Sequence, residues 1–167
     1  YFANPATYTG TGAAPTFTYT LSKDNGAAQT VTLNSTVTEA GSYTLTATTT
    51  VNGMTGSKSV TFVIEKADRT ITVEALPELY VGGATAQVKV TDTAPETESR
   101  TYTYATSDEK VATVSSTGVV TPVGEGTATI TVTAPATANY KEAAATATVK
   151  VSALPAQEVS FAKEGAQ

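Results

Sequence analysis

The chain has 167 residues and no cysteine, histidine or tryptophan, which excludes disulfide bonds, thiolate metal sites and histidine-based acid–base catalysis. Its formal net charge of −5 argues against nucleic acid as a partner, because binding to a phosphate backbone requires clustered lysine and arginine. No apolar run approaches the roughly twenty residues of a membrane span, and the length allows one large domain or two small ones.

The residue types favour β-sheet. Threonine makes up about a fifth of the chain, and β-branched and aromatic residues fit the half-buried surface of a pleated sheet. Leucine and methionine, which favour helices, are sparse. The composition therefore predicts an all-β protein. The chain opens at Tyr1 rather than methionine, and we interpret it as a processed or excised fragment.

The first half shows four alternating runs. Alternation of polar and apolar residues predicts strands over 16–21, 29–33, 42–51 and 57–64. The stretch "SKDNG" (22–26) predicts a turn, and Asn52-Gly53 predicts a tight hairpin because both residues tolerate positive φ. The short, charged "EKADR" (65–69) follows, and we interpret it as a stiff junction between domains because it holds no Gly or Pro.

The strand pattern then restarts. Strands are expected over 70–76, 78–83, 86–92, 100–108, 110–123 (two short strands around a turn), 126–134 and 144–151. Each half ends with a long strand, a loop and a partner strand, which indicates an internal repeat of small β-sandwiches. The predicted domains are residues 1–66 and 67–153. Residues 154–167 form a tail in which "EVSFA" (158–162) is a candidate first strand of a following domain.

A tyrosine lies just past a glycine at the start of the longest strand of the first half. Gly41 allows a sharp turn, and Tyr43 and Leu45 share one face of the strand. In immunoglobulin-like sandwiches a tyrosine at this place packs at the corner between sheets, and its hydroxyl bonds to backbone a few residues upstream. We therefore interpret Tyr43 as such a corner residue, with Leu45 where antibody domains carry a cysteine.

The stretch "VATVSSTGVVTPVGEGTATITVTA" (111–134) resembles the signature of bacterial Ig-like domains of group 2, the invasin and intimin type. In that family the turn glycine corresponds to Gly118, and Gly124 and Gly126 precede the long strand. The stretch "MTGSKSVTFVI" (54–64) resembles a looser relative. The resemblance implies two tandem immunoglobulin-like β-sandwich domains.

The same resemblance implies a function and a location. It points to an extracellular or cell-surface protein of a bacterium, in which such modules act as stalk, spacer or adhesive arm. The implied partners are neighbouring Ig-like domains of the same chain and a host or cell-surface protein or glycan, and we expect a monomer. No cofactor, metal or nucleic acid is expected, and neither is an enzymatic activity.

Three tyrosines are the candidate ligand-binding residues. Tyr102 and Tyr104 share a strand face, and Tyr140 lies in a loop. They could form an aromatic platform for sugar rings, or they could cover the sandwich core and its rim. The absence of tryptophan favours the second interpretation. The platform would make the chain a carbohydrate-binding accessory domain of a secreted glycan-active enzyme, which is the alternative function.

Charged side chains offer two weaker alternatives. Glu96 and Glu98 lie two residues apart in a loop, but acidic loop residues are usually solvated, and no spacing matches a calcium loop. The strand lysines Lys58, Lys89 and Lys150 could each form an amide cross-link to an asparagine. Strand lysines, however, more often face water and protect sheet edges.

Overall fold

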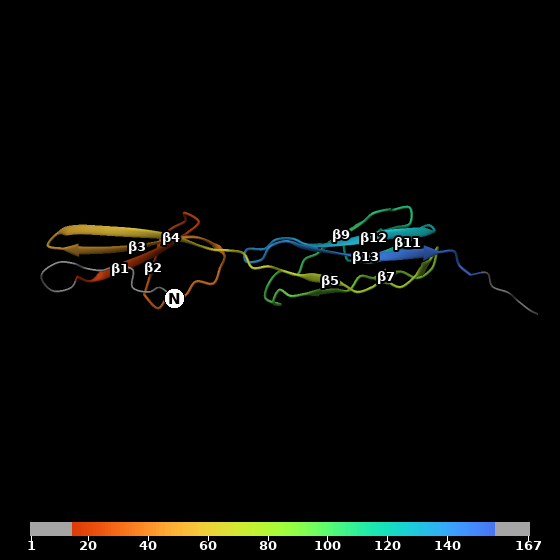
Figure 1. Cartoon of the computed structure of the whole chain (residues 1–167), viewed down its shortest axis with the longest axis horizontal. Coiled ribbons are helices and arrows are strands. Elements are labelled where there is room, and N and C mark those ends of the chain that lie inside the picture. The colour runs from red at the N-terminus through yellow and green to blue at the C-terminus, as the bar shows by residue number, and fades with distance from the viewer. Residues whose placement is uncertain (1–14, 156–167) are drawn as a thin grey trace, which may run out of the picture. The chain divides into compact units, whose positions relative to one another are not determined.

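The computed structural model describes residues 15–155, which form strands and no helix. The chain divides into two compact units (Figure 1): Tyr1–Asp68 with Thr137–Lys141, and Arg69–Ala136 with Glu142–Gln167. The candidate strand 158–162 lies outside the described residues. The all-β prediction is confirmed for the residues that are described.

The first unit contains one four-stranded antiparallel sheet in the order β2-β1-β3-β4. Its strands are β1 (Phe17–Lys23), β2 (Gln29–Val31), β3 (Gly41–Val51) and β4 (Met54–Ile64). The hairpin between β3 and β4 turns at Asn52 and Gly53, with φ of 51° and 78°. The predicted hairpin is therefore present, and eleven residue pairs, from Gly41↔Ile64 to Val51↔Met54, join its strands.

The two faces of this sheet differ in chemistry. The core of the unit consists of Tyr19, Leu45 and Ala47, with other apolar residues of the same face packed around them. The opposite face carries hydroxyl groups from three strands: Thr18, Thr20, Thr44, Thr46, Thr48, Ser57, Ser59 and Thr61. Period-two alternation along each strand produces this separation.

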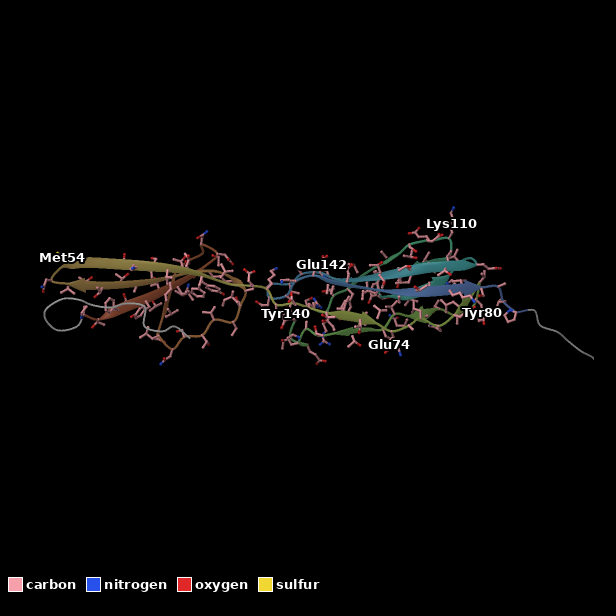
Figure 2. All side chains as sticks on the ribbon, in the orientation of Figure 1. Met54, Glu74, Tyr80, Lys110, Tyr140 and Glu142 are labelled. Carbon is pink, nitrogen blue, oxygen red and sulfur yellow. The ribbon has the colours of Figure 1, made fainter. Side chains whose placement is uncertain are left out.

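A two-sheet sandwich was predicted for residues 1–66, but the described part of the unit holds a single sheet. Val60 lies opposite Leu45 on the core face of β4, yet it is 49% exposed. Met54, at the hairpin end of the same strand, is 74% exposed (Figure 2). Alternation predicts which face of β4 is apolar, whereas the burial of that face depends on what lies opposite.

The second unit is built from two layers. One is a four-stranded sheet in the order β6-β13-β12-β9. Its strands are β6 (Leu79–Tyr80), β13 (Ala143–Ser152), β12 (Gly126–Ala134) and β9 (Thr103–Thr106). The other contains the three-stranded sheet β10-β11-β7 and the pair β5-β8. These strands are β10 (Ala112–Val114), β11 (Val119–Pro122), β7 (Ala86–Gln87), β5 (Ile71–Val73) and β8 (Val90–Asp92).

The first segment of this unit changes from one layer to the other. β5 pairs antiparallel with β8, and β6 pairs parallel with β13. Pro77 lies between β5 and β6, and because proline has no backbone N–H it cannot continue a hydrogen-bonded ladder. The strand predicted over 70–76 is shorter in the structure, where β5 ends at Val73.

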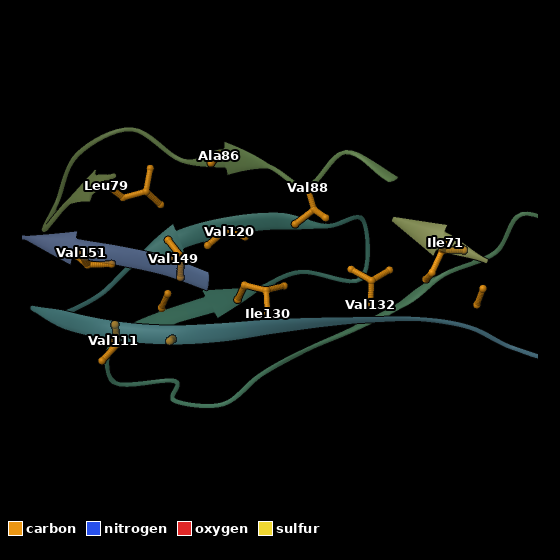
Figure 3. Packing of buried hydrophobic residues seen from close by; sticks show 13 residues of the cluster. Ile71, Leu79, Ala86, Val88, Val111, Val120, Ile130, Val132, Val149 and Val151 are labelled. Atoms are coloured by element: carbon orange, nitrogen blue, oxygen red, sulfur yellow. The ribbon is translucent and has the colours of Figure 1, made fainter. Parts of the chain in front are cut away.

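The core of the second unit lies between the layers (Figure 3). Ala128, Ile130, Val132 and Ala134 alternate along β12 and are at most 1% exposed. Val120 of β11 and Val149 of β13 are also fully buried. Threonines occupy the intervening positions of β12, so the alternation seen in the sequence is the alternation between core and solvent.

Part of the loop between β12 and β13 groups with the first unit rather than with the second. Residues 135–143 were expected to be a loop of the second domain, but Thr137–Lys141 groups with the first unit. Ala67 and Tyr140 form an isolated parallel bridge, and the Ala40 N–H donates to Asn139 Oδ1 over 3.0 Å. These contacts join residues far apart in sequence, which no local pattern reveals.

Candidate functional site

Tyr43 forms the polar contact of a corner residue. It is 3% exposed, and its hydroxyl donates to the Glu39 carbonyl oxygen over 2.8 Å. Its ring stacks on Phe62 with centroids 5.3 Å apart. Leu45, two residues on, is buried in the core of the unit. Gly41 has a φ of 156°, and a Cβ there would lie 2.7 Å from Cε of Lys23. Because glycine has no Cβ, the backbone can pass this close to Lys23 as it enters β3.

The most highly connected polar group lies in the second unit. The Arg69 and Asp92 side chains are 0% and 1% exposed and form an ion pair. Arg69 Nε donates to both carboxylate oxygens of Asp92 over 3.1 Å, and Nη2 donates to Oδ2 over 2.5 Å. Asp92 also accepts from the Ala94 N–H over 2.9 Å and from the Tyr102 hydroxyl over 2.9 Å. We call Arg69, Asp92 and Tyr102 the buried ionic centre.

The buried ionic centre has clear electrostatic consequences. The bond from the Arg69 guanidinium lowers the pKa of Asp92 to about 2, against the opposing effect of burial. Burial and the bond to Asp92 raise the pKa of Tyr102. A buried ion pair is stable only when its remaining bonding capacity is satisfied. Arg69 meets this requirement with further bonds to the carbonyl oxygens of Ser99 and Pro135.

The buried ionic centre could not be predicted from local sequence patterns. Arg69 ends a charged stretch that was interpreted as a junction, and Asp92 ends an alternating run. Charges at strand ends are normally solvated. Arg69 precedes β5 and Asp92 ends β8, and the sequence alone does not show that these two strands pair. The pairing of β5 with β8, Ile71 opposite Asp92, brings them together.

Two of the family glycines lie against core side chains. Gly118 has a φ of 80°, and a Cβ there would lie 2.8 Å from Cζ of Tyr104. Gly126, at the start of β12, has a φ of 145°, and its Cβ would lie 2.9 Å from Cγ2 of Val111. Gly124 lies close to backbone, since its Cβ would be 2.7 Å from the Lys110 carbonyl oxygen. A side chain at any of these positions would require a neighbour to move.

The structure places the three candidate tyrosines in two different environments. Tyr102 and Tyr104 pack against the core of the second unit, and burial raises the pKa of Tyr104. Tyr140 belongs to the segment that groups with the first unit. The three rings therefore do not form a platform within either unit. The interpretation that Tyr102 and Tyr104 cover the core agrees with their packing.

Each unit has an open surface groove. In the first, a groove of about 320 Å³ is lined by Phe17, Tyr19, Val31 and Leu33 together with threonines. In the second, a groove of about 300 Å³ is lined by residues that include Leu76, Pro77 and Gln87.

The strand lysines of the second unit make surface ion pairs. Lys89 lies 3.3 Å from Glu74 and Lys150 lies 2.8 Å from Glu78, with lysine side chains 70% and 65% exposed. Figure 2 shows Glu74 at the surface of this unit. A lysine that forms an amide cross-link needs a buried setting that lowers its pKa. Neither lysine has such a setting.

Three general features of residues 15–155 bear on the kind of site. No group of three or more Asp or Glu side chains among these residues could hold a metal ion. The same residues include no helix of the length and hydrophobicity that crossing a membrane requires. Every buried side-chain nitrogen and oxygen of the described residues has a hydrogen-bond partner.

The second unit is an immunoglobulin-like β-sandwich module. It has two facing layers, its first segment pairs with both of them, and the buried side-chain nitrogens and oxygens of its described residues all have hydrogen-bond partners. Residues 69–149 match the family described as bacterial Ig-like domain (group 2). The resemblance seen in residues 111–134 is thereby confirmed for this one domain. A comparison with curated proteins gave no match. Domains of this family are generally non-catalytic and typically occur in bacterial surface proteins.

Proposed function

We propose that the chain is a non-catalytic, extracellular part of a bacterial surface protein that acts as a stalk, spacer or adhesive arm. The observation that carries this proposal is the match of residues 69–149 to the group 2 bacterial Ig-like domains. The geometry is in keeping with it. In the second unit, the buried Arg69 and Asp92 side chains bond to each other and so tie together strands of the sandwich.

The distribution of hydroxyl groups also supports a solvated arm. In the first unit one sheet face presents serine and threonine from β1, β3 and β4. In the second unit Thr129 and Thr131 of β12 lie opposite Thr148 and Thr146 of β13 on the outer face. Such faces remain hydrated without exposing large apolar patches that would promote aggregation.

Surface location can be tested directly on intact cells of the source bacterium. An antibody raised against residues 69–152 should label unpermeabilised cells in flow cytometry, and mild protease treatment should remove the label. An antibody against a cytoplasmic protein provides the control. Labelling that appears only after permeabilisation would contradict the proposal.

A glycan array can separate the stalk or adhesive arm from a carbohydrate-binding accessory domain. We expect no binding that depends on Tyr104, because its ring packs against the core. Tyr80, which is 38% exposed, provides the matched control: Tyr80→Ala alters a surface ring without touching the core. Binding lost in a folded Tyr104→Ala variant but retained in Tyr80→Ala would favour the accessory domain. The proposed partners are adjacent Ig-like domains and a host or cell-surface protein or glycan.

A further inference from the structure

Two strands of the second unit, β6 near its start and β13 at its end, lie side by side and run in the same direction. Leu79 of β6 lies opposite Val151 of β13, and Tyr80 lies opposite Ser152. The Val81 N–H extends the pairing with a bond to the Ser152 carbonyl oxygen over 3.0 Å. Because the strands are parallel, the chain enters β6 and leaves β13 at opposite ends of the pair.

This direction decides how the unit responds to tension. Pulling the two ends of the unit apart moves β6 backward and β13 forward, so the strands are sheared along their axes. The bonds between them then share the load and must break together. In an antiparallel hairpin pulled open from its free ends, the bonds break one after another. Shear therefore gives the higher barrier, and the rate of forced unfolding depends on that barrier.

Side chains reinforce the same pair of strands. The Glu78 carboxylate, just before β6, accepts hydrogen bonds from Lys150 Nζ over 2.8 Å and from Ser152 Oγ over 2.5 Å. On the core side Leu79 and Val151 are 5% and 2% exposed. Sliding β6 along β13 would break both bonds to Glu78 and disturb the apolar contact. We call Glu78–Val81 with Lys150–Ser152 the terminal-strand clamp.

A second anchor holds the point where the chain enters the unit. Arg69, its first residue, is tied to Asp92 of β8 by the buried ion pair. Thr70 and Thr93 then exchange bonds, with the Thr93 N–H donating to the Thr70 carbonyl oxygen over 3.0 Å. The segment from Arg69 to Val81 is therefore attached to one layer through β8 and to the other through β13. Tension applied at Arg69 must disrupt both attachments before the layers separate.

We propose that the second unit is a tension-resisting module, in which the terminal-strand clamp sets the resistance to pulling and the buried ionic centre anchors the segment that leads to it. This inference rests on the proposed role as a surface stalk or arm, since such a protein transmits force between the cell and whatever it contacts. In this proposal Glu78 holds β6 in register with β13 under load, through its bonds to Lys150 and Ser152.

Single-molecule force spectroscopy of the full chain, held at its two ends, tests this proposal. Unfolding of the second unit is recognised by a length increase of roughly 25–30 nm, as expected for a segment of this size at about 3.3–3.6 Å per residue. We expect Glu78→Gln to raise the forced unfolding rate of this unit by about fivefold to tenfold. The control Glu74→Gln removes the exposed pair with Lys89, which lies outside the clamp, and should leave the rate unchanged.

A change of pulling direction provides a second test. The chain has no cysteine, so Thr129→Cys with Thr148→Cys defines a unique axis across β12 and β13, which are antiparallel and directly paired there. Pulling on this pair should open the hairpin at markedly lower force than pulling on the chain ends. Denaturant titration shows whether each variant remains folded.

Two results would overturn the inference. One is equal unfolding force along the two axes, and the other is a Glu78→Gln variant that unfolds under load at the same rate as the parent chain. Either result would leave surface location, which antibody labelling measures separately, untouched. Conversely, a high resistance to shear in a protein that never reaches the cell surface would contradict the proposed function and not the clamp.

Discussion

Tyr43 and Glu39 are joined by a hydrogen bond in which the tyrosine hydroxyl donates to a backbone carbonyl four residues upstream, over 2.8 Å. The bond closes the turn that leads into β3, and the ring beneath it stacks on Phe62. A side chain thus fixes the path of the backbone where the chain contains no disulfide to do so. This relationship leads to the first prediction.

Tyr43→Phe should keep the stacked ring and lose the hydroxyl, so that the Glu39 carbonyl loses its bond. We expect the free energy of unfolding of the first unit to fall by about 1 kcal/mol, in line with the loss of one buried hydrogen bond. Urea titration followed by near-UV circular dichroism provides the measurement. Tyr80→Phe, on a residue that is 38% exposed, is the control. An unchanged midpoint for Tyr43→Phe would count against the role of this bond.

The buried ionic centre predicts a dependence of stability on pH. The pKa of Asp92 is about 2 in the folded protein, below the value near 3.9 of an unfolded chain. Its contribution is therefore complete above about pH 4 to 5, and it is lost as the pH falls toward and through 2. We expect a loss of roughly 2–3 kcal/mol for the second unit over this interval. Thermal unfolding between pH 6 and pH 2 measures it.

Asp92→Asn separates this effect from general acid denaturation. The variant should remove the part of the pH dependence due to this carboxylate and should lower stability at neutral pH by about 3–5 kcal/mol, because Arg69 stays buried without a charged partner. Glu96→Gln is the control, since that side chain is 91% exposed. If Asp92→Asn and the parent chain lost stability in parallel as the pH falls, the proposed titration of Asp92 would be wrong.

Gly118 and Gly82 allow backbone strain to be separated from steric overlap. Both have positive φ, 80° and 69°, but only a Cβ at Gly118 would collide with a neighbour, the ring of Tyr104. Gly82→Ala should cost about 1 kcal/mol from the left-handed backbone alone. Gly118→Ala should cost about 1–3 kcal/mol more, as overpacking does. Equal losses in denaturant titrations of the two variants would show that Tyr104 moves aside freely.

The layer of fully buried residues leads to a further prediction. Ile130 on β12 is 0% exposed and lies in the middle of the core. Ile130→Ala should destabilise the second unit by about 2–5 kcal/mol, through lost burial and the cavity left behind. Val123→Ala, at a position that is 48% exposed, should change stability by less than about 0.5 kcal/mol. Comparable effects at both positions would contradict the two-layer core.

Much of the strand content could be predicted because sheet residues alternate between core and solvent with a period of two. The predicted strand over 126–134 has the same bounds as β12, and that over 144–151 differs from β13 by one residue at each end. The turn at Asn52-Gly53 was equally predictable, because few residues tolerate positive φ. These features depend only on residues near each other in the chain.

Other features were beyond local patterns. The expected run over 86–92 is divided into β7 and β8, which pair with different partners, β11 and β5. The division cannot be predicted without knowing those partners. Val60 lies opposite Leu45 on the core face of β4. It remains 49% exposed because burial requires an opposite layer as well as the correct face.

Composition and alternation by themselves determined that the chain is all-β and where its long strands run, since both depend on neighbouring residues. The Ig-like assignment of residues 111–134 came instead from their resemblance to a known family, which the match of residues 69–149 supports. Only the tertiary structure decided that Arg69 meets Asp92, that β6 runs parallel to β13, and that the rings of Tyr102 and Tyr104 cover a core. Each of these contacts joins segments separated by many residues, and its energy depends on burial, which exists only after the layers have come together.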